Sequence, residues 1–261
     1  MDAIIITYLT LMAVALYMFS FFIILTFRNR EKLFSYPKAD RDYSISILVP
    51  AYNEEKSIEE TIKHIMNLDY PKEKVEVIVL NDGSKDKTSE IVKKLMKKYK
   101  NLILIDKENS GKADSLNIGV KKAQGEVIAV VDSDSFPDKE SLRKLTGYFN
   151  DRCMGAVTSF VTVRNKENNF FAKIQSIEYV IMGWSRKLLD LVDSVYVTNG
   201  PLSLYRKEYI LKVGGFDRNT VTEDIDITWN MLNHNYKTAM CLDAHVTTIV
   251  PNSLKKWFRQ R

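Results

Sequence analysis

The sequence predicts an α/β fold in which one N-terminal transmembrane helix precedes a mostly parallel β-sheet with flanking helices. Short, continuous apolar runs alternate with amphipathic helical stretches, which is typical of parallel strands buried on both faces. The first residues form a long stretch without charge. Of the 261 residues, 45% are hydrophobic and 27% are charged, a balance that excludes disordered and low-complexity proteins.

Residues 1–27 are expected to anchor the chain in a membrane. Residues 3–27 carry no charge and would extend about 37 Å as a helix, which is enough to cross a bilayer. A cleaved signal peptide would begin with a basic region and end in small residues, whereas this segment begins Met1-Asp2 and ends in bulky apolar residues. A buried core helix would be unusually long. Three basic residues follow at once, so the positive-inside rule places the rest of the chain in the cytoplasm (Arg28, Arg30 and Lys32).

Residues 28–44 are polar and contain Pro37, and they predict a juxtamembrane linker before a domain at residues 45–261. Strands are expected at 46–49, 75–80, 102–105 and 127–131, with helices near 57–67, 86–99 and 112–123. Ser57 and Glu60 fit a capping box, and Asp86 is placed to cap the following helix. Lysines at 93, 94, 97, 98 and 100 predict the solvated face of that helix.

Beyond residue 150 the pattern loosens into a β-like run at 156–163 and a helical stretch from about 170 to 191. Apolar residues recur in that stretch at helical spacing, which predicts a face packed in the core. On a membrane-anchored enzyme the same stripe would instead rest on the bilayer surface. Another helix opens at residues 222–224. The stripe consists of Phe170, Phe171, Ile174, Ile177, Ile181 and Trp184.

The overall charge and the cysteines narrow the expected partners and compartment. A net charge of +5 suits an anionic membrane face or a phosphate-bearing ligand, and it does not predict nucleic-acid binding. Cys153 and Cys241 lie far apart in unrelated apolar contexts, so two free thiols in a reducing compartment are expected.

Polar residues follow three of the predicted strands. The first strand runs into residues 50–55 (PAYNEE), the second into residues 81–84 (NDGS), and the fourth into residues 132–134 (DSD). In an open parallel sheet, ligands collect beyond the carboxyl ends of the strands. Each segment alone is typical of a turn, but three at one crevice predict a binding site.

The residue types at these ends suit a nucleoside diphosphate. Asp132 and Asp134 have a spacing that lets two carboxylates approach a divalent cation shared with substrate phosphates. Lys112 follows Gly111 at a helix start and supplies a charge for phosphate, unless it is simply a surface lysine. Asp82 is placed to accept a hydrogen bond from an imide such as that of uracil, or to form an Asx turn. Neither a P-loop nor a dinucleotide-binding glycine motif occurs.

Seven stretches follow one another as they do in a known family, and the match runs over residues 45–261. The chain resembles the family 2 glycosyltransferases of the Rossmann-like GT-A fold, especially the membrane-embedded processive branch that includes hyaluronan, chitin, cellulose and poly-N-acetylglucosamine synthases. The stretches are PAYNEE (50–55), NDGSKD (81–86), SGKADSLN (110–117), DSD (132–134), TNG (198–200), VGGF (213–216) and TED (222–224).

This resemblance implies inverting transfer from a UDP-sugar, such as UDP-N-acetylglucosamine or UDP-glucose, to a saccharide or lipid-linked acceptor at a membrane, with Mn²⁺ or Mg²⁺ as cofactor. It implies a β-linked product in polysaccharide or glycolipid synthesis. Residues 45–135 would form the nucleotide-binding half and residues 136–261 the acceptor half. Nucleotide-sugar contacts would come from Ala51, Tyr52, Glu54, Asp82, Lys112, Asp132 and Ser133, metal contacts from Asp134 and Asp132, the catalytic base from Asp224, and acceptor contacts from Thr198, Asn199, Gly200, Glu223, Gln260 and Arg261.

Two departures from the family pattern are visible. The family usually has two acids before Gly83, whereas this chain has Asn81-Asp82. The processive branch carries a Gln-x-x-Arg-Trp motif, and this chain stops one residue after Gln260, so we expect a truncated synthase that binds UDP and metal but makes little long polymer. By resemblance to some GT-A enzymes, His245 is a further candidate metal ligand.

Two other classes remain open. A sugar nucleotidyltransferase also uses paired acids and a lysine, but it would normally show an N-terminal glycine-rich phosphate loop. A non-catalytic, membrane-anchored binder of nucleotide sugars is compatible with the short C-terminus. Donor hydrolysis distinguishes both from a transferase.

Overall fold

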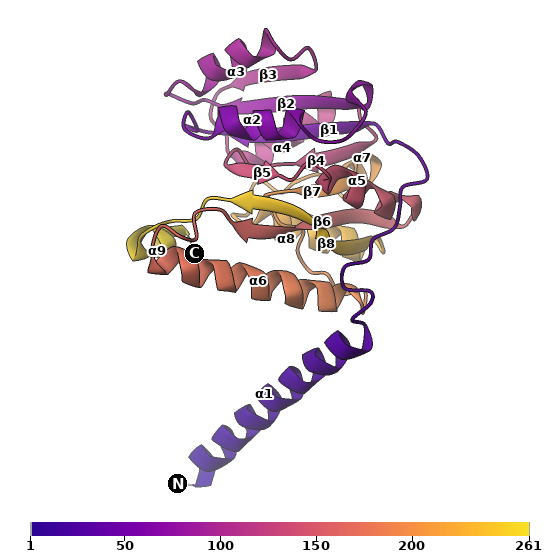
Figure 1. Cartoon of the computed structure of the whole chain (residues 1–261), viewed down its shortest axis with the longest axis vertical. Coiled ribbons are helices and arrows are strands. Elements are labelled where there is room, and N and C mark those ends of the chain that lie inside the picture. Colours follow the sequence, from indigo (N-terminus) through magenta and orange to yellow (C-terminus); the bar gives the residue numbers. More distant parts are fainter. Residues whose placement is uncertain (1, 261) are drawn as a thin grey trace.

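One mixed β-sheet forms the centre of the domain (Figure 1). The computed structural model describes residues 2–260. In this part of the chain the strand order is β3-β2-β1-β4-β7-β6-β8-β5. The strands are β1 (Ile45–Ala51), β2 (Val75–Asp82), β3 (Leu102–Lys107), β4 (Val127–Val130), β5 (Ser135–Pro137), β6 (Met154–Val163), β7 (Ser203–Arg206) and β8 (Lys237–Thr248). The helices are α1 (Asp2–Arg28), α2 (Ile58–Met66), α3 (Thr88–Met96), α4 (Lys112–Lys122), α5 (Ser141–Thr146), α6 (Phe170–Asp190), α7 (Lys207–Lys212), α8 (Glu223–Asn233) and α9 (Leu254–Gln260).

Strands β1 to β4 form the parallel half of the sheet. β1 pairs in parallel with both β2 and β4, so that Ile47 lies opposite Val77 on one side and Ala129 on the other. All three side chains are fully buried. This explains why these strands are continuous apolar runs, since both sheet faces are covered. The four strands and three helices predicted for residues 45–131 are confirmed.

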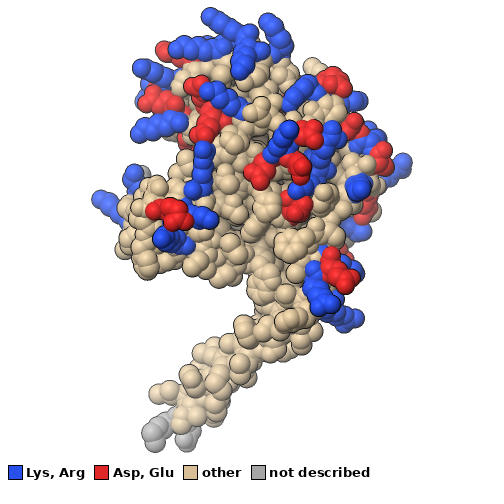
Figure 2. All heavy atoms as spheres, in the orientation of Figure 1, with Lys and Arg blue, Asp and Glu red and all other residues tan. Residues whose placement is uncertain are grey.

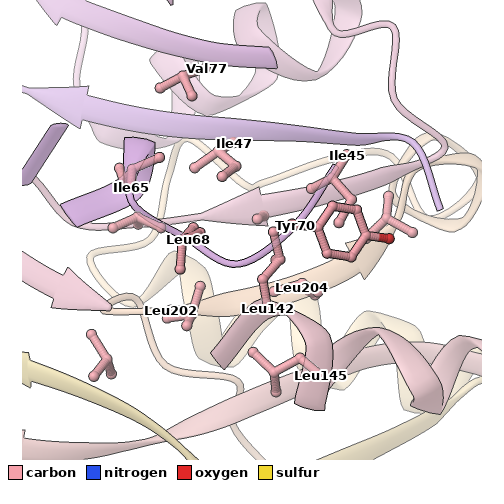
Figure 3. Packing of buried hydrophobic residues seen from close by; sticks show 14 of the residues in the cluster. Ile45, Ile47, Ile65, Leu68, Tyr70, Val77, Leu142, Leu145, Leu202 and Leu204 are labelled. Atoms are coloured by element: carbon pink, nitrogen blue, oxygen red, sulfur yellow. The ribbon is translucent and has the colours of Figure 1, made fainter. Parts of the chain in front are cut away.

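The second half of the sheet is mixed. β7 runs antiparallel to β4 and to β6, whereas β8 runs parallel to β6 and antiparallel to β5. Buried residues from both halves share one core: Figure 3 shows Ile45 and Ile47 of β1 close to Leu142 and Leu145 of α5 and Leu204 of β7. The two halves therefore pack around one shared core.

Helix α1 is a candidate membrane span. Residues 3–28 are long and apolar enough to cross a bilayer, and no side chain along the tested window is buried in the protein. Residues 3–27 carry no charge, and Figure 2 shows the protruding part of this helix without charged side chains, whereas Lys and Arg gather over α3. Only its last turns touch the domain, where Phe22 lies 5.9 Å from Trp184 of α6, measured between ring centroids.

The predicted linker has neither helix nor strand from residue 29 to residue 44, but it packs along the domain. Leu33 and Tyr43 are buried. At Gly147 a Cβ atom would lie 1.8 Å from the carbonyl oxygen of Pro37, so only glycine allows this close approach.

Helix α6 corrects one prediction. Its apolar stripe does not face the core: Ile174, Ile177 and Ile181 are 47%, 61% and 55% exposed. The face that is buried carries Ala172, Arg186 and other residues. Helical periodicity shows that a helix has an apolar face but not whether that face packs against the protein or against other surroundings. The prediction that this face packs in the core was therefore wrong. In Figure 1, α6 lies on the side of the domain from which α1 extends.

A second correction concerns the start of α2. Ser57 does not cap the helix, because its hydroxyl donates to Glu54 Oε2 at 2.7 Å. Glu60, the other half of the predicted box, instead accepts from Arg164 at 2.7 Å. Asp86 is not the N-cap residue of α3 either, because Lys87 occupies that position without a side-chain cap. Asp86 lies one residue earlier, and its Oδ1 accepts the backbone N–H of Thr88, the first residue of the helix, at 3.0 Å.

Candidate active site

The polar segments after β1, β2 and β4 meet at one edge of the sheet. Because β1 lies between β2 and β4 and runs parallel to both, the three carboxyl ends point the same way. A cavity of about 270 Å³ opens there. Every residue predicted to contact the nucleotide sugar lines this cavity: Ala51, Tyr52, Glu54, Asp82, Lys112, Asp132 and Ser133, together with Asp134.

A second cavity, of about 480 Å³, adjoins the first. The two cavities share Lys112, Asp132 and Asp134 as lining residues. The second cavity extends to Asp224 at the start of α8 and to Asn199 and Gly200 before β7. The structure thus places the predicted base and two predicted acceptor contacts on the far side of the paired aspartates from Tyr52 and Asp82.

Lys112 lies at the boundary between the two cavities and forms two ion pairs there. Its Nζ lies 2.8 Å from Asp132 Oδ1 and 2.8 Å from Glu223 Oε1. Burial lowers the pKa of Lys112, but the charges of Asp132 and Glu223 outweigh this and raise the pKa above its usual value. Glu223, predicted to contact the acceptor, is therefore engaged by the lysine at the boundary between the cavities.

Asp134 has the environment of a carboxylate that suits a cation. Burial and the nearby charges of Asp132 and Glu54 raise the pKa of Asp134 to about 6. Its hydrogen bond from Ser135 is long, at 3.4 Å. Two adjacent carboxylates of which one carries no cationic partner fit a divalent ion that takes its other ligands from phosphates.

His245 does not complete a metal site. Its ring packs edge-on against Phe160, with 5.5 Å between the centroids. No group of three or more His, Cys, Asp or Glu side chains in the described part of the chain is arranged to hold a metal ion. The hypothesis of His245 as a third protein ligand is therefore not supported.

Asp82 organises the loop that precedes Lys112. Its carboxylate accepts the backbone N–H groups of Ser110 and Gly111, each at 2.9 Å, and a hydrogen bond from Lys107. Burial acts to raise the pKa of Asp82, but these hydrogen bonds lower it below its usual value, so the group is ionised at neutral pH. Next to it, Asn81 donates to Asp106 Oδ1 at 2.7 Å, a bond that an acid at position 81 could not make when ionised.

Asp224 occupies the first turn of α8. Its Oδ1 accepts the backbone N–H of Ile225 at 2.9 Å. Burial raises the pKa of Asp224 and the neighbouring Glu223 adds to the rise, while Lys112 opposes it. A carboxylate whose pKa is raised is a better proton acceptor than a free aspartate.

Apart from Glu223, the predicted acceptor residues divide into three groups. Asn199 and Gly200 line the larger cavity. Thr198 does not: its side chain is buried, with its hydroxyl 2.7 Å from that of Thr228 and 3.0 Å from that of Tyr205, so the structure does not bring it to the cavity. Gln260 ends α9, with its side chain outside the described part of the structure, and Arg261 lies outside the described residues altogether.

Gly200 permits a close approach between two segments of the site. A Cβ atom at this position would lie 2.6 Å from Asp132 Oδ2. The loop before β7 therefore passes directly against the first aspartate, and a side chain at position 200 would displace that carboxylate.

The contribution of α6 to the site was not predicted from the sequence. Tyr179, Met182, Gly183 and Arg186 line the larger cavity, and they recur at spacings of three and four residues on one helix face. The one signal in the sequence was an arginine within a largely apolar helical stretch, which the stripe on the opposite face obscured.

A further cavity, of about 720 Å³, lies elsewhere, between α4, α7, α8 and the loop at residues 213–219. None of the predicted site residues lines it. Volume alone therefore does not locate the site, whereas the convergence of three strand ends on paired carboxylates does.

Comparison with known proteins agrees with this geometry. A poly-beta-1,6-N-acetyl-D-glucosamine synthase of Staphylococcus aureus (strain COL) is 33% identical over 220 residues, which are 83% of this chain and 52% of that protein. The chain thus spans about half the length of this relative.

Two solved structures share the fold. The mannosyltransferase PcManGT from Pyrobaculum calidifontis, in complex with GDP-Man and Mn²⁺, has a TM-score of 0.73 and 22% identity over 93% of this chain and 68% of its own. Staphylococcus aureus TarS 1-349 in complex with UDP has a TM-score of 0.63 and 25% identity over 79% of this chain and 60% of its own. These likenesses confirm the GT-A fold class.

The family model described as Glycosyl transferase family 2 matches residues 46–214, which include the segments after β1, β2 and β4. This match makes the nucleotidyltransferase alternative wrong and confirms the resemblance drawn from the seven stretches. The chain belongs to glycosyltransferase family 2.

Proposed function

We propose that this chain is the catalytic part of a membrane-anchored, inverting hexosyltransferase that uses a UDP-sugar donor. The observation that carries the proposal is that the predicted donor residues and the predicted base line two cavities meeting at Lys112, Asp132 and Asp134. UDP in the TarS structure and the name of the staphylococcal relative favour UDP-N-acetylglucosamine as the first donor to test, with UDP-glucose second.

Asp134 and Asp132 would hold the divalent ion, Mn²⁺ or Mg²⁺. The bound ion would neutralise charge on the departing diphosphate. The Mn²⁺ complex of the mannosyltransferase supports this choice of cation.

The remaining residues bind and orient the reactants. Lys112 offers a charge to the diphosphate. Tyr52, 48% exposed at the cavity, and Asp82 would hold the uridine. Asp224 would take the proton from the acceptor hydroxyl as that oxygen attacks the sugar from the face opposite the diphosphate. Single displacement of this kind converts an α-linked donor into a β-linked product.

The membrane side of the proposal rests on α1 and α6. α1 would span the bilayer with the domain in the cytoplasm, because Arg28, Arg30 and Lys32 follow it. The exposed stripe of α6 would rest on the bilayer surface beside it. A saccharide or lipid-linked acceptor would then enter the larger cavity close to the membrane.

Nucleotide release tests the proposal. The full chain, purified in detergent, is incubated with a panel of nucleotide sugars with and without a chelator, beside Asp134→Ala and the exposed-site control Asp138→Ala. We expect release of UDP that requires metal, is lost in Asp134→Ala and is retained in Asp138→Ala. Equal UDP affinity with and without chelator would refute the metal assignment. Tight binding of UDP-sugars without any turnover, with or without added saccharide acceptors, would favour the non-catalytic alternative.

A further inference from the structure

Arg186 is a buried cation without an anionic partner. Its side chain is 5% exposed. Nη1 donates to the side-chain oxygen of Asn199 at 2.8 Å, and no ion pair among the described residues involves Arg186. Its Nε is the one buried side-chain nitrogen or oxygen in the described part of the chain that has no hydrogen-bond partner.

The neighbouring Lys187 is a buried cation whose charge is paired within the protein. Lys187 is 4% exposed, but its Nζ lies 2.6 Å from Asp190 Oδ2 and 2.9 Å from the carbonyl oxygen of Met240. Arg186, one residue earlier, faces the 480 Å³ cavity instead. Native proteins satisfy buried polar groups, so an unpartnered guanidinium beside a cavity indicates a missing ligand.

Arg186 is not needed to satisfy its one partner. Asn199 Oδ1 also accepts from the hydroxyl of Thr158 at 2.7 Å, so this oxygen keeps a hydrogen bond when Arg186 is removed. The other cation at the cavity, Lys112, is already paired with Asp132 and Glu223. Arg186 forms no ion pair with a described carboxylate. Burial lowers the pKa of Arg186 below its usual value and outweighs the charge of Asp224, in the same cavity, which acts to raise it.

We propose that Arg186 binds phosphate oxygens of a ligand in the larger cavity through its guanidinium group. This inference rests on the proposed function, which supplies a phosphate-bearing ligand. A guanidinium edge offers two parallel N–H donors that match two oxygens of a phosphate group. Two sources share this chemistry: the diphosphate of the donor, and a phosphate carried by the acceptor.

Stability without ligand separates this role from a structural one. A buried cation that only awaits a ligand costs folding free energy, so Arg186→Met should melt at or above the wild-type temperature. The matched control Lys187→Met leaves Asp190 buried without its partner and should melt lower. A fall in melting temperature for Arg186→Met as large as that for Lys187→Met would overturn the inference.

Ligand binding then identifies the source of the phosphate. The full chain in detergent is titrated by calorimetry with UDP and with uridine in the presence of Mn²⁺, and the UDP-loaded protein is titrated with glycerol phosphate. If the donor is the source, Arg186→Met weakens UDP binding by about tenfold or more and leaves uridine unchanged. If the acceptor is the source, UDP binding stays unchanged and glycerol phosphate binding weakens by about tenfold or more. Arg186→Lys, which keeps the charge, should recover part of the loss.

The outcomes also separate this inference from the proposed function. Wild-type protein that binds UDP with metal, beside an Arg186→Met variant that matches it within about twofold for both UDP and glycerol phosphate, refutes only the role of Arg186. Wild-type protein that binds neither ligand refutes both proposals.

Discussion

Replacing Asp134 by Asn should stabilise the metal-free protein while removing its response to metal. Burial, Asp132 and Glu54 raise the pKa of Asp134 to about 6, which means that the folded protein disfavours the charged form. Asn keeps the shape of the side chain and removes the charge. The ionised carboxylate therefore lowers the stability of the folded protein, as is common for residues that bind a ligand.

The size of the effect follows from the pKa. A rise from the usual 3.8 to about 6 corresponds to about 3 kcal/mol, at about 1.4 kcal/mol per pH unit. Partial exposure and the weak bond from Ser135 reduce this gain, so we expect Asp134→Asn to unfold with a free energy higher by about 1–3 kcal/mol at pH 8. For a domain of this size that is a rise in Tm of about 2–10 °C.

The sign of the pH dependence is specific. Because the folded pKa lies above the unfolded one, the penalty is present above about pH 6 and decreases as the pH falls toward about 4, where Asp134 is protonated in the folded state and begins to be protonated in the unfolded state. The advantage of Asp134→Asn over wild type should therefore shrink across this window. Thermal melts of both proteins in detergent, followed by circular dichroism from pH 8 to pH 4 with chelator present, measure it.

Two further measurements complete this test. Adding Mn²⁺ with UDP should raise the Tm of wild type and leave Asp134→Asn almost unchanged, since binding to the folded state alone is stabilising. Asp132→Asn is the matched control, because Asp132 is paired with Lys112 at 2.8 Å and its replacement should not stabilise the protein. An Asp134→Asn variant that melts below wild type at pH 8 without metal would refute the reasoning.

Three other outcomes are expected. Asp224→Asn should lower the rate of sugar transfer by about 10² to 10⁴ in an active form of the enzyme, with UDP affinity within about threefold of wild type. Transfer by the wild type should decline as the pH falls through the raised pKa of Asp224. Normal transfer by the variant would assign the base elsewhere. Gly200→Ala should weaken metal-dependent UDP binding, measured by calorimetry, because its Cβ would lie 2.6 Å from Asp132 Oδ2, and an unchanged affinity would show that Asp132 moves freely. Protease added outside sealed cells should leave a tag after residue 261 intact, whereas its digestion would contradict the cytoplasmic orientation.

The donor side of the site was predictable because its geometry is local to parallel strands. β1, β2 and β4 are continuous apolar runs, and the residues after them must share an edge once the strands pair in parallel. The sequence alone therefore predicted that three residues after these strands lie at one cavity: Tyr52, Asp82 and Asp132.

The acceptor side was harder because its strands are short or irregular. β5 and β7 have three and four residues, too few for a periodic pattern, and β8 pairs with β6 through register shifts. Thr198 stands beside Asn199 in the sequence, but its hydroxyl turns to Thr228 of α8, and a motif does not reveal such an orientation. Arg186 was missed because no sequence pattern distinguishes an arginine that lines a cavity from one on the solvated face of a helix.

Helix α6 alone separates part of the larger cavity from the outer surface of the protein. Tyr179, Met182, Gly183 and Arg186 form part of the inner wall of the larger cavity, while Ile174, Ile177 and Ile181 face outward. A helix with its side chains is about 10 Å across, so only this distance separates the interior of the larger cavity from the outer surface of the protein. At Gly183 there is no slack, because a Cβ atom there would lie 2.3 Å from Phe160. The 480 Å³ cavity therefore shares one of its walls with the outer surface of the protein, whereas α6 does not line the 270 Å³ cavity.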